Sequence, residues 1–127
     1  MLRATRTEIH LPNLAHNIAV VRRFLRPGTK LLAVVKANAY GHGLEEVARY
    51  AVSHGADFLG VAIAEEGIRL RKAGIDAPVL ILGASLDTHI DCILEYDLTP
   101  TVFSIHTLEM LQRAAAHCGG TCRFHFK

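Results

Sequence analysis

The sequence lacks the marks of several specialised classes of protein. Its 14 Lys and Arg against 12 Asp and Glu give a net charge of +2, too small to indicate nucleic-acid binding, and no basic stripe carries interleaved aromatic residues. No apolar run approaches the roughly 18 residues that suggest a membrane-spanning helix. Residues 1–7 are polar and lack the apolar segment of a signal peptide. We therefore expect a cytoplasmic protein with no nucleic-acid or membrane partner.

Cysteine is scarce and irregularly spaced. Cys92, Cys118 and Cys122 are odd in number and contain no CxxC pair, so they do not indicate a disulfide framework. Reduced thiols in a cytoplasmic protein are the simple interpretation. The alternative is a metal site, since His117 and His125 lie near the last two cysteines, but structural zinc sites usually pair their ligands more tightly. We expect no metal.

Nucleotide-binding signatures and internal boundaries are also missing. No GxGxxG follows an expected strand, and there is no P-loop. No linker or low-complexity segment divides the chain. What is present is the composition of an ordinary folded domain, because 127 residues, 50% hydrophobic and 20% charged, are enough for one core.

Apolar runs alternate with amphipathic segments along the chain. We expect strands at 7–11, 30–36, 58–64, 79–82, 98–103 and 121–126, and helices at 14–26, 44–54, 65–73, 85–94 (or from 87) and 104–117. Residues 1–12 would form a leading strand, and Asn13 and Ser104 would cap the helices that they precede. Pro100 weakens the strand that contains it.

This repetition of strand and helix predicts an α/β fold with a parallel sheet and right-handed crossovers. A complete (β/α)8 barrel needs roughly 200 or more residues. The chain is therefore either the N-terminal portion of a barrel, with strands from about residue 30 and truncated at about strand five, or a smaller open α/β domain; we favour the portion of a barrel. Its unpaired edge and exposed sheet face predict that residues 1–127 alone are insoluble or partly folded.

The most informative stretch is residues 31–43, LLAVVKANAYGHG. Its apolar start is typical of a strand buried on both faces, and Lys36 follows that strand directly. Ligands bind at the C-terminal ends of strands in α/β folds, and a desolvated lysine amine has a lowered pKa and is nucleophilic. The alternative is a lysine whose stem lies along the core while its amine reaches water.

Residues 35–43, VKANAYGHG, resemble the pyridoxal-phosphate attachment motif of the alanine racemases. TEIHLPNLAHNI near the start, APVLILGA later and FHFK at the end follow in the order and spacing of that family, so the resemblance extends over nearly the whole chain. It implies the N-terminal part of a TIM-type (β/α)8 barrel that binds pyridoxal 5'-phosphate, without the family's C-terminal β domain.

The resemblance also implies an activity, the interconversion of L-alanine and D-alanine that supplies D-alanine for peptidoglycan. Lys36 would hold the cofactor as a Schiff base and exchange a proton on one face of the substrate. A tyrosine from the partner subunit of a homodimer would act on the other face. That tyrosine lies beyond residue 127 in the family pattern, so the fragment alone is expected to be inactive.

Four further residues take roles from the resemblance. Tyr40 would bind the cofactor phosphate, with a half-buried loop tyrosine as the alternative. Val34 would line the cofactor pocket, and Leu82 would lie near the ring, with ordinary strand core as the alternative for Leu82. Lys127 matches a lysine that is carbamylated in some family members; the alternative is an ordinary lysine at a barrel end. His42 is interpreted as loop structure.

Other functions on the same barrel stay open. One is a single-domain homeostasis protein that carries pyridoxal phosphate without racemase activity, and another is a serine-accepting racemase. A decarboxylase of the same barrel type is disfavoured by the YGHG continuation at residues 40–43.

Overall fold

Five parallel strands form one sheet and follow each other in chain order. A computed structural model describes residues 7–127, with β1 (Leu32–Val34), β2 (Phe58–Val61), β3 (Val79–Ala84), β4 (Thr99–Val102) and β5 (His125–Phe126) in the order β1-β2-β3-β4-β5. A doubly wound open sheet reverses its order at a switch point, whereas the strands of a barrel are sequential. The predicted α/β class and parallel sheet are confirmed, and the strand order favours part of a barrel.

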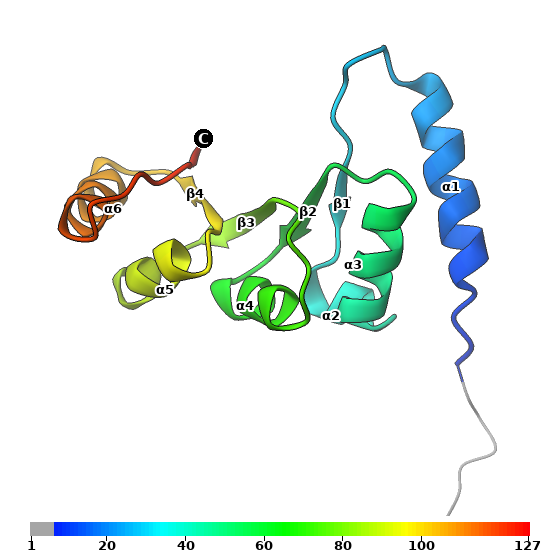
Figure 1. Cartoon of the computed structure of the whole chain (residues 1–127), viewed down its shortest axis with the longest axis horizontal. Coiled ribbons are helices and arrows are strands. Elements are labelled where there is room, and N and C mark those ends of the chain that lie inside the picture. Colours follow the sequence, from blue (N-terminus) through cyan, green and yellow to red (C-terminus); the bar gives the residue numbers. More distant parts are fainter. Residues whose placement is uncertain (1–6) are drawn as a thin grey trace, which may run out of the picture.

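The helices lie along one side of this sheet. They are α1 (Leu11–Phe24), α2 (Lys36–Tyr40), α3 (Leu44–Ser53), α4 (Ala64–Lys72), the 3-10 turn η1 (Asp87–His89), α5 (Ile90–Glu95) and α6 (Ile105–His117). Figure 1 shows α3 to α6 following the outer side of the curved sheet, with α1 beyond α3. Each helix after a strand returns the chain to begin the next parallel strand.

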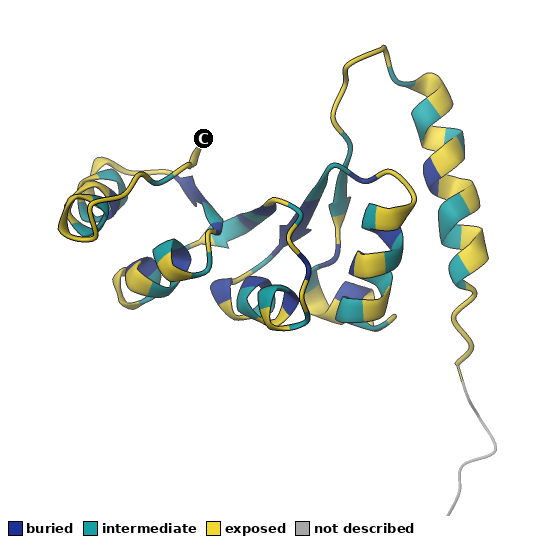
Figure 2. Ribbon diagram, in the orientation of Figure 1, coloured by how far each residue is buried: buried dark blue, intermediate teal, exposed yellow. Residues whose placement is uncertain are grey.

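The core lies between the sheet and these helices. Leu59 and Val61 of β2 are fully buried there, and so are Val79 and Ile81 of β3. Figure 2 shows buried residues on the sides of α3 to α5 that face the sheet, whereas α1 has one buried residue, Ile18. Successive side chains of a strand point to opposite faces of the sheet, so the face away from the helices forms the inside of the barrel.

That inner face carries Val34 and Leu82. A Cβ built on Gly60 would lie 3.3 Å from Leu82 Cδ1 and 3.5 Å from Val34 Cγ2, so both side chains flank this glycine on one face. Val34 is 38% exposed, although it is a valine in the middle of an apolar run. The inner face is therefore apolar and only partly covered in residues 7–127.

Proline explains a difference between expectation and structure at the start of the described chain. Residues 7–10 form no strand, and Pro12 lies in the first turn of α1, where its missing N–H would be unpaired in any case. The expected strand at 7–11 is thus wrong where it is described, and its part in residues 1–6 lies outside the described residues. Asn13 is inside the helix; the N-cap is His10, which makes no side-chain capping bond.

Pro100, in contrast, does occupy a strand. It lies opposite Ile81 next to a register shift between β3 and β4, and it is buried. Thr101 Oγ1 donates a hydrogen bond of 2.6 Å to the Ile81 carbonyl, so this carbonyl is paired beside a residue that has no N–H.

Of the other expected elements, the strand at 30–36 is reduced to Leu32–Val34, the strand at 58–64 is reduced to Phe58–Val61, and the helix at 14–26 is Leu11–Phe24, while α2 was not expected. The expected helix at 44–54 is α3, and Ser104 caps α6 as predicted, its Oγ accepting from Thr107 N at 3.2 Å. The expected strand at 121–126 is reduced to His125–Phe126. We attribute this shortening to the single neighbour, β4, with which β5 pairs in the described chain.

Candidate functional site

Lys36 lies where β1 ends, at the C-terminal edge of the sheet. Val35 N still pairs with Gly60 O at 2.8 Å, as a strand residue would, and Lys36 then opens α2. Lys36 is half-buried, and its Nζ has neither a hydrogen bond nor an ion pair within residues 7–127. The structure therefore places a half-buried lysine, with no partner for its amine in the described residues, at the edge where ligands bind in such folds.

The residues after Lys36 form a left-handed turn. Ala37, Asn38, Ala39 and Tyr40 all have φ between 52° and 56°, and Gly41 continues at 86°. Left-handed helical backbone costs about 1–2 kcal/mol for each L-residue with a side chain. Strain of this kind persists only where the surrounding structure determines it, and it concentrates at functional sites. The sequence predicted a loop here but gave no sign of four strained non-glycine residues in succession.

Hydrogen bonds inside the motif hold the turn together. Ala39 N donates to Val35 O at 2.8 Å, and Gly43 N donates to Asn38 O at 3.0 Å. The Asn38 side chain accepts from Leu44 N at 3.0 Å and so satisfies a free N–H at the start of α3.

His42 also serves this turn. Its Nδ1 lies 2.9 Å from Ala39 O and, when protonated, donates to that carbonyl. The ring thus bonds to the backbone of its own loop, in keeping with the expected loop role.

One residue of this site was missed from the sequence. Glu66 of α4 accepts from Asn38 N at 3.3 Å through Oε1 and from Ala62 N at 2.9 Å through Oε2. Its contact with Asn38 spans 28 residues of sequence, so no local pattern reveals it. The position of Glu66 in the first turn of a helix that follows a strand was the only available signal.

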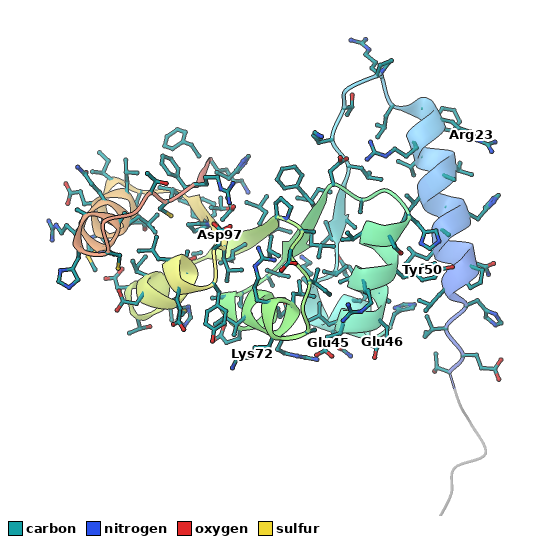
Figure 3. The ribbon with its side chains drawn as sticks, viewed as in Figure 1. Arg23, Glu45, Glu46, Tyr50, Lys72 and Asp97 are labelled. Carbon is teal, nitrogen blue, oxygen red and sulfur yellow. The ribbon has the colours of Figure 1, made fainter. Side chains whose placement is uncertain are left out.

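Neighbouring contacts fix the helices around the turn. Figure 3 shows Glu45 and Glu46 at the start of α3, close to α2. Glu45 Oε1 lies 3.2 Å from Arg69 NH2 and so joins α3 to α4. At the next strand, Gly83 N donates to Ala62 O at 3.1 Å, and a Cβ at Gly83 would lie only 2.5 Å from that oxygen. The C-terminal edge is therefore closely packed from β1 to β3.

Two of the expected cofactor residues line a common cavity. Val34 and Tyr40 border a hollow of about 500 Å³ together with His42 and the start of α1. Tyr40 is 60% exposed, and its hydroxyl has no partner in the described part of the chain. Lys36 and Leu82 are not among the residues that line this cavity, although Leu82 flanks Gly60 beside Val34.

Lys127 lies farther along the sheet. Its N–H donates to Val102 O at 3.0 Å, and its Nζ is 5.6 Å from the centre of the Phe103 ring, a cation–π contact. The strands β2 and β3 separate the end of β4 from that of β1. The structure thus places Lys127 at the same edge as Lys36 but not beside it.

Residues 7–127 contain neither a cluster of metal ligands nor a helix that could span a membrane. No group of three or more His, Cys, Asp and Glu side chains lies close enough to hold a metal ion. No helix of the described chain is both long and apolar enough to span a membrane.

Comparison with known proteins gives a consistent result. Residues 9–127 match the family described as alanine racemase, N-terminal domain. Alanine racemase 2 of Oceanobacillus iheyensis is 44% identical over 125 residues, which are 98% of this chain and 32% of that protein. The alanine racemase of Geobacillus kaustophilus is 44% identical over 124 residues, again 98% of this chain and 32% of the relative. The chain thus spans 32% of the length of both relatives.

Solved structures agree. The alanine racemase of Clostridium difficile 630 superposes with a TM-score of 0.88 at 36% identity, covering 91% of this chain and 30% of that one. A histidine racemase from Leuconostoc mesenteroides gives a TM-score of 0.82 at 25% identity, covering 92% of this chain and 34% of that one. These likenesses confirm the resemblance drawn from the motif and the N-terminal part of a barrel.

Proposed function

Because this chain belongs to the alanine racemase family, we propose that it is the cofactor-bearing N-terminal part of a pyridoxal 5'-phosphate-dependent isomerase that interconverts L-alanine and D-alanine. The observation that carries the proposal is Lys36, a half-buried amine without a partner in residues 7–127, at the end of β1 and inside the VKANAYGHG motif. Relatives at 44% identity over almost the whole chain support the choice of alanine.

The residues present fit this cofactor. A cofactor aldehyde needs an amine that is accessible and not held in an ion pair, and Lys36 meets both conditions in the described chain. A phosphate needs a donor near the surface, which the exposed Tyr40 hydroxyl supplies. An aromatic ring needs apolar neighbours, and Val34 and Leu82 provide them on the inner face.

We assign the roles accordingly. When bound, pyridoxal phosphate supplies the electron sink that makes the substrate's α-proton removable. Lys36 would hold the cofactor through its Nζ, and once the substrate amine has displaced it, the free Nζ would exchange the proton at the substrate α-carbon. Tyr40 would donate a hydrogen bond from its hydroxyl to the phosphate. Val34 and Leu82 would provide apolar contacts to the ring and limit the access of water.

Inversion of the α-carbon needs a second proton-transfer group on the opposite face of the substrate. We propose that a tyrosine from the partner subunit of a homodimer provides it, as the family resemblance implies. The relatives extend well beyond the 32% of their length that this chain matches, which leaves room for such a residue. A cytoplasmic location and a supply of D-alanine to peptidoglycan complete the proposal.

Substitution of the lysine tests the assignment directly. In the full-length enzyme that contains this chain, Lys36→Ala should abolish both the visible absorption of the lysine-bound cofactor and the racemase activity, because no other amine of this strand end replaces Nζ. Lys72→Ala is the matched control, since Lys72 is an exposed lysine at the end of α4 (Figure 3). Retained visible absorption in Lys36→Ala, or a colourless wild-type enzyme in excess pyridoxal phosphate, would reject the proposal.

A panel of amino acids distinguishes the alternatives. Fold alone does not set the substrate, because the histidine racemase shares it at a TM-score of 0.82. Full-length enzyme should racemise L-alanine with a higher kcat/KM than L-serine or L-histidine. Preference for serine would indicate the serine-accepting racemase, and bound cofactor without any racemisation would indicate the homeostasis protein.

Carbamylation of Lys127 is a separate proposal. The modification would turn a cation into an anion and remove the cation–π contact with Phe103. Intact-protein mass spectrometry under native conditions should show the added mass of one CO2, lost on acidification and absent in Lys127→Ala. An unmodified amine in the well-ordered full-length enzyme would contradict it.

A further inference from the structure

One carboxylate joins two strand ends at the candidate site. Glu66 Oε2 accepts from Ala62 N, directly after β2, at 2.9 Å, and its Oε1 accepts from Asn38 N, in the turn after β1, at 3.3 Å. Glu66 is half-buried and has no cationic partner within residues 7–127. Both oxygens are therefore used for backbone N–H groups.

The contact with Ala62 alone has an ordinary structural explanation. Glu66 stands in the first turn of α4, where an acidic side chain favours the helix N-terminus and often reaches back to a free N–H before the helix. This contact would serve any strand–helix connection in the barrel. It gives no reason for the second oxygen to contact a different strand end.

The contact with Asn38 is different in kind. Asn38 is the second of the left-handed residues, and it lies in the segment that directly follows Lys36. The same residue accepts at its side chain from Leu44 N and at its carbonyl from Gly43 N. A strained turn needs such external support, and the N–H of Asn38 receives it from α4.

We propose that Glu66 is a positioning residue, which holds the left-handed turn in place and thereby fixes the direction in which Lys36 leaves β1. Its effect on catalysis rests on the proposed function, whereas its effect on the turn does not. The inference rests on two hydrogen bonds that this one carboxylate accepts from N–H groups at the ends of two adjacent strands.

Glu66→Gln is the discriminating variant. A glutamine side chain keeps one acceptor oxygen but places an NH2 group where the second oxygen was, so we expect it to keep the shorter bond, from Ala62 N, and to lose the longer bond from Asn38 N. Glu65→Gln is the matched control, because Glu65 is the exposed neighbour on the same turn and its carboxylate lies 3.6 Å from His89 instead. Both variants remove one negative charge from the start of α4.

Amide hydrogen exchange in the full-length enzyme measures the protection of the turn's backbone amides, and this measurement does not depend on catalysis. Glu66→Gln should speed exchange in the peptide covering residues 35–43 by about tenfold or more, the loss expected for a charge-assisted hydrogen bond. Exchange of the β3 core at Val79–Ala84 should stay unchanged, and Glu65→Gln should change neither. Equal acceleration in both segments, or none at residues 35–43, would overturn the proposal.

A second measurement separates this inference from the proposed function. Glu66→Gln should still bind pyridoxal phosphate but form the lysine-bound cofactor about tenfold more slowly, with kcat lowered more than KM is raised. Unchanged rates and kcat would reject the positioning role. If Lys36→Ala retained the cofactor band, the proposed function would fail, while the exchange result for Glu66 would still stand.

If Glu66→Gln does not fold, hydrogen exchange of the wild-type enzyme still tests the inference. The Asn38 amide should exchange slowly although Asn38 is an exposed residue, because its N–H is bonded to the carboxylate. Fast exchange of this amide in the wild type would contradict the inference without any substitution.

Discussion

At the scale of single residues, the site depends on backbone atoms that the sequence does not display. The roles of Lys36, Tyr40, Val34 and Leu82 come from the family resemblance, and the structure places Lys36 directly after a strand as expected. The contacts between Glu66 and the backbone at Asn38 and Ala62 became apparent only in the structure, where the ends of β1 and β2 lie side by side. Contacts to N–H groups leave no trace in residue type, because every residue except proline has the same donor.

Gly83 is the residue at this edge that tolerates a side chain least. Its Cβ would lie 2.5 Å from the Ala62 carbonyl oxygen, and a backbone atom cannot turn away as a flexible side chain can. We expect Gly83→Ala to destabilise the protein by about 1–3 kcal/mol, the usual range for overpacking, in urea unfolding of the full-length enzyme.

Gly120→Ala is the control for that substitution. A Cβ at Gly120 meets nothing within 4 Å, and its φ is not in the left-handed region. This variant should be neutral or slightly stabilising, because alanine reduces the freedom of the unfolded chain. Equal stability of the two variants would contradict the close approach of β2 and β3 at Ala62.

At the scale of elements, prediction succeeded where strong local signals agreed with the tertiary structure. The boundaries of α3 followed from glycines at 43 and 55, and Ser104 capped α6 as its side chain suggests. Prediction failed at residues 7–11, where alternating polarity suggested a strand although Pro12 is also well suited to the first turn of a helix. The left-handed turn had no signal, because tertiary contacts maintain it against local preference.

One carboxylate adds a polar contact to the apolar packing of α1, in which Ile18 is buried with Ala51 and Ala56. Asp57 forms an ion pair with Arg22 of α1 and accepts from Leu31 N at 2.8 Å, just before β1. Arg22 also donates to Thr29 O at 2.9 Å. The Leu31 N–H and the Arg22 guanidinium lower the pKa of Asp57 from 3.8 to about 2. The charged carboxylate therefore favours the folded state.

This shift predicts a specific acid sensitivity. Because the pKa of Asp57 is lower in the folded state, its contribution to stability is complete above about pH 4 and is lost as the pH falls toward 2. At pH 6, the free energy of unfolding of Asp57→Asn should be lower than that of wild type. This difference should shrink as the pH falls toward 2, because the wild-type carboxylate becomes protonated. Chemical unfolding of both proteins at several pH values measures this; a difference independent of pH would contradict the assignment.

At the scale of the whole molecule, the sheet has two faces with different surroundings. The outer face is covered by helices and holds the core. The inner face and the segment after α6 leave large apolar side chains in contact with water, with Val34 38%, Phe124 42% and Phe126 74% exposed. A barrel interior is normally filled by side chains from all its strands, so this exposure suits a chain that matches 32% of its relatives' length.

The 127 residues expressed alone should therefore aggregate or fold only partly. The edge of β5 offers unpaired backbone groups beyond its one neighbour in the described chain, and the apolar inner face adds a surface for association. Size-exclusion chromatography should show large species, with strong binding of a hydrophobic dye. Phe126→Asp should reduce this association because it adds charge to an exposed edge residue, whereas Leu59→Asp should abolish folding because Leu59 is fully buried. A monomer with one sharp thermal transition would show instead that the outer core alone is sufficient for a stable fold.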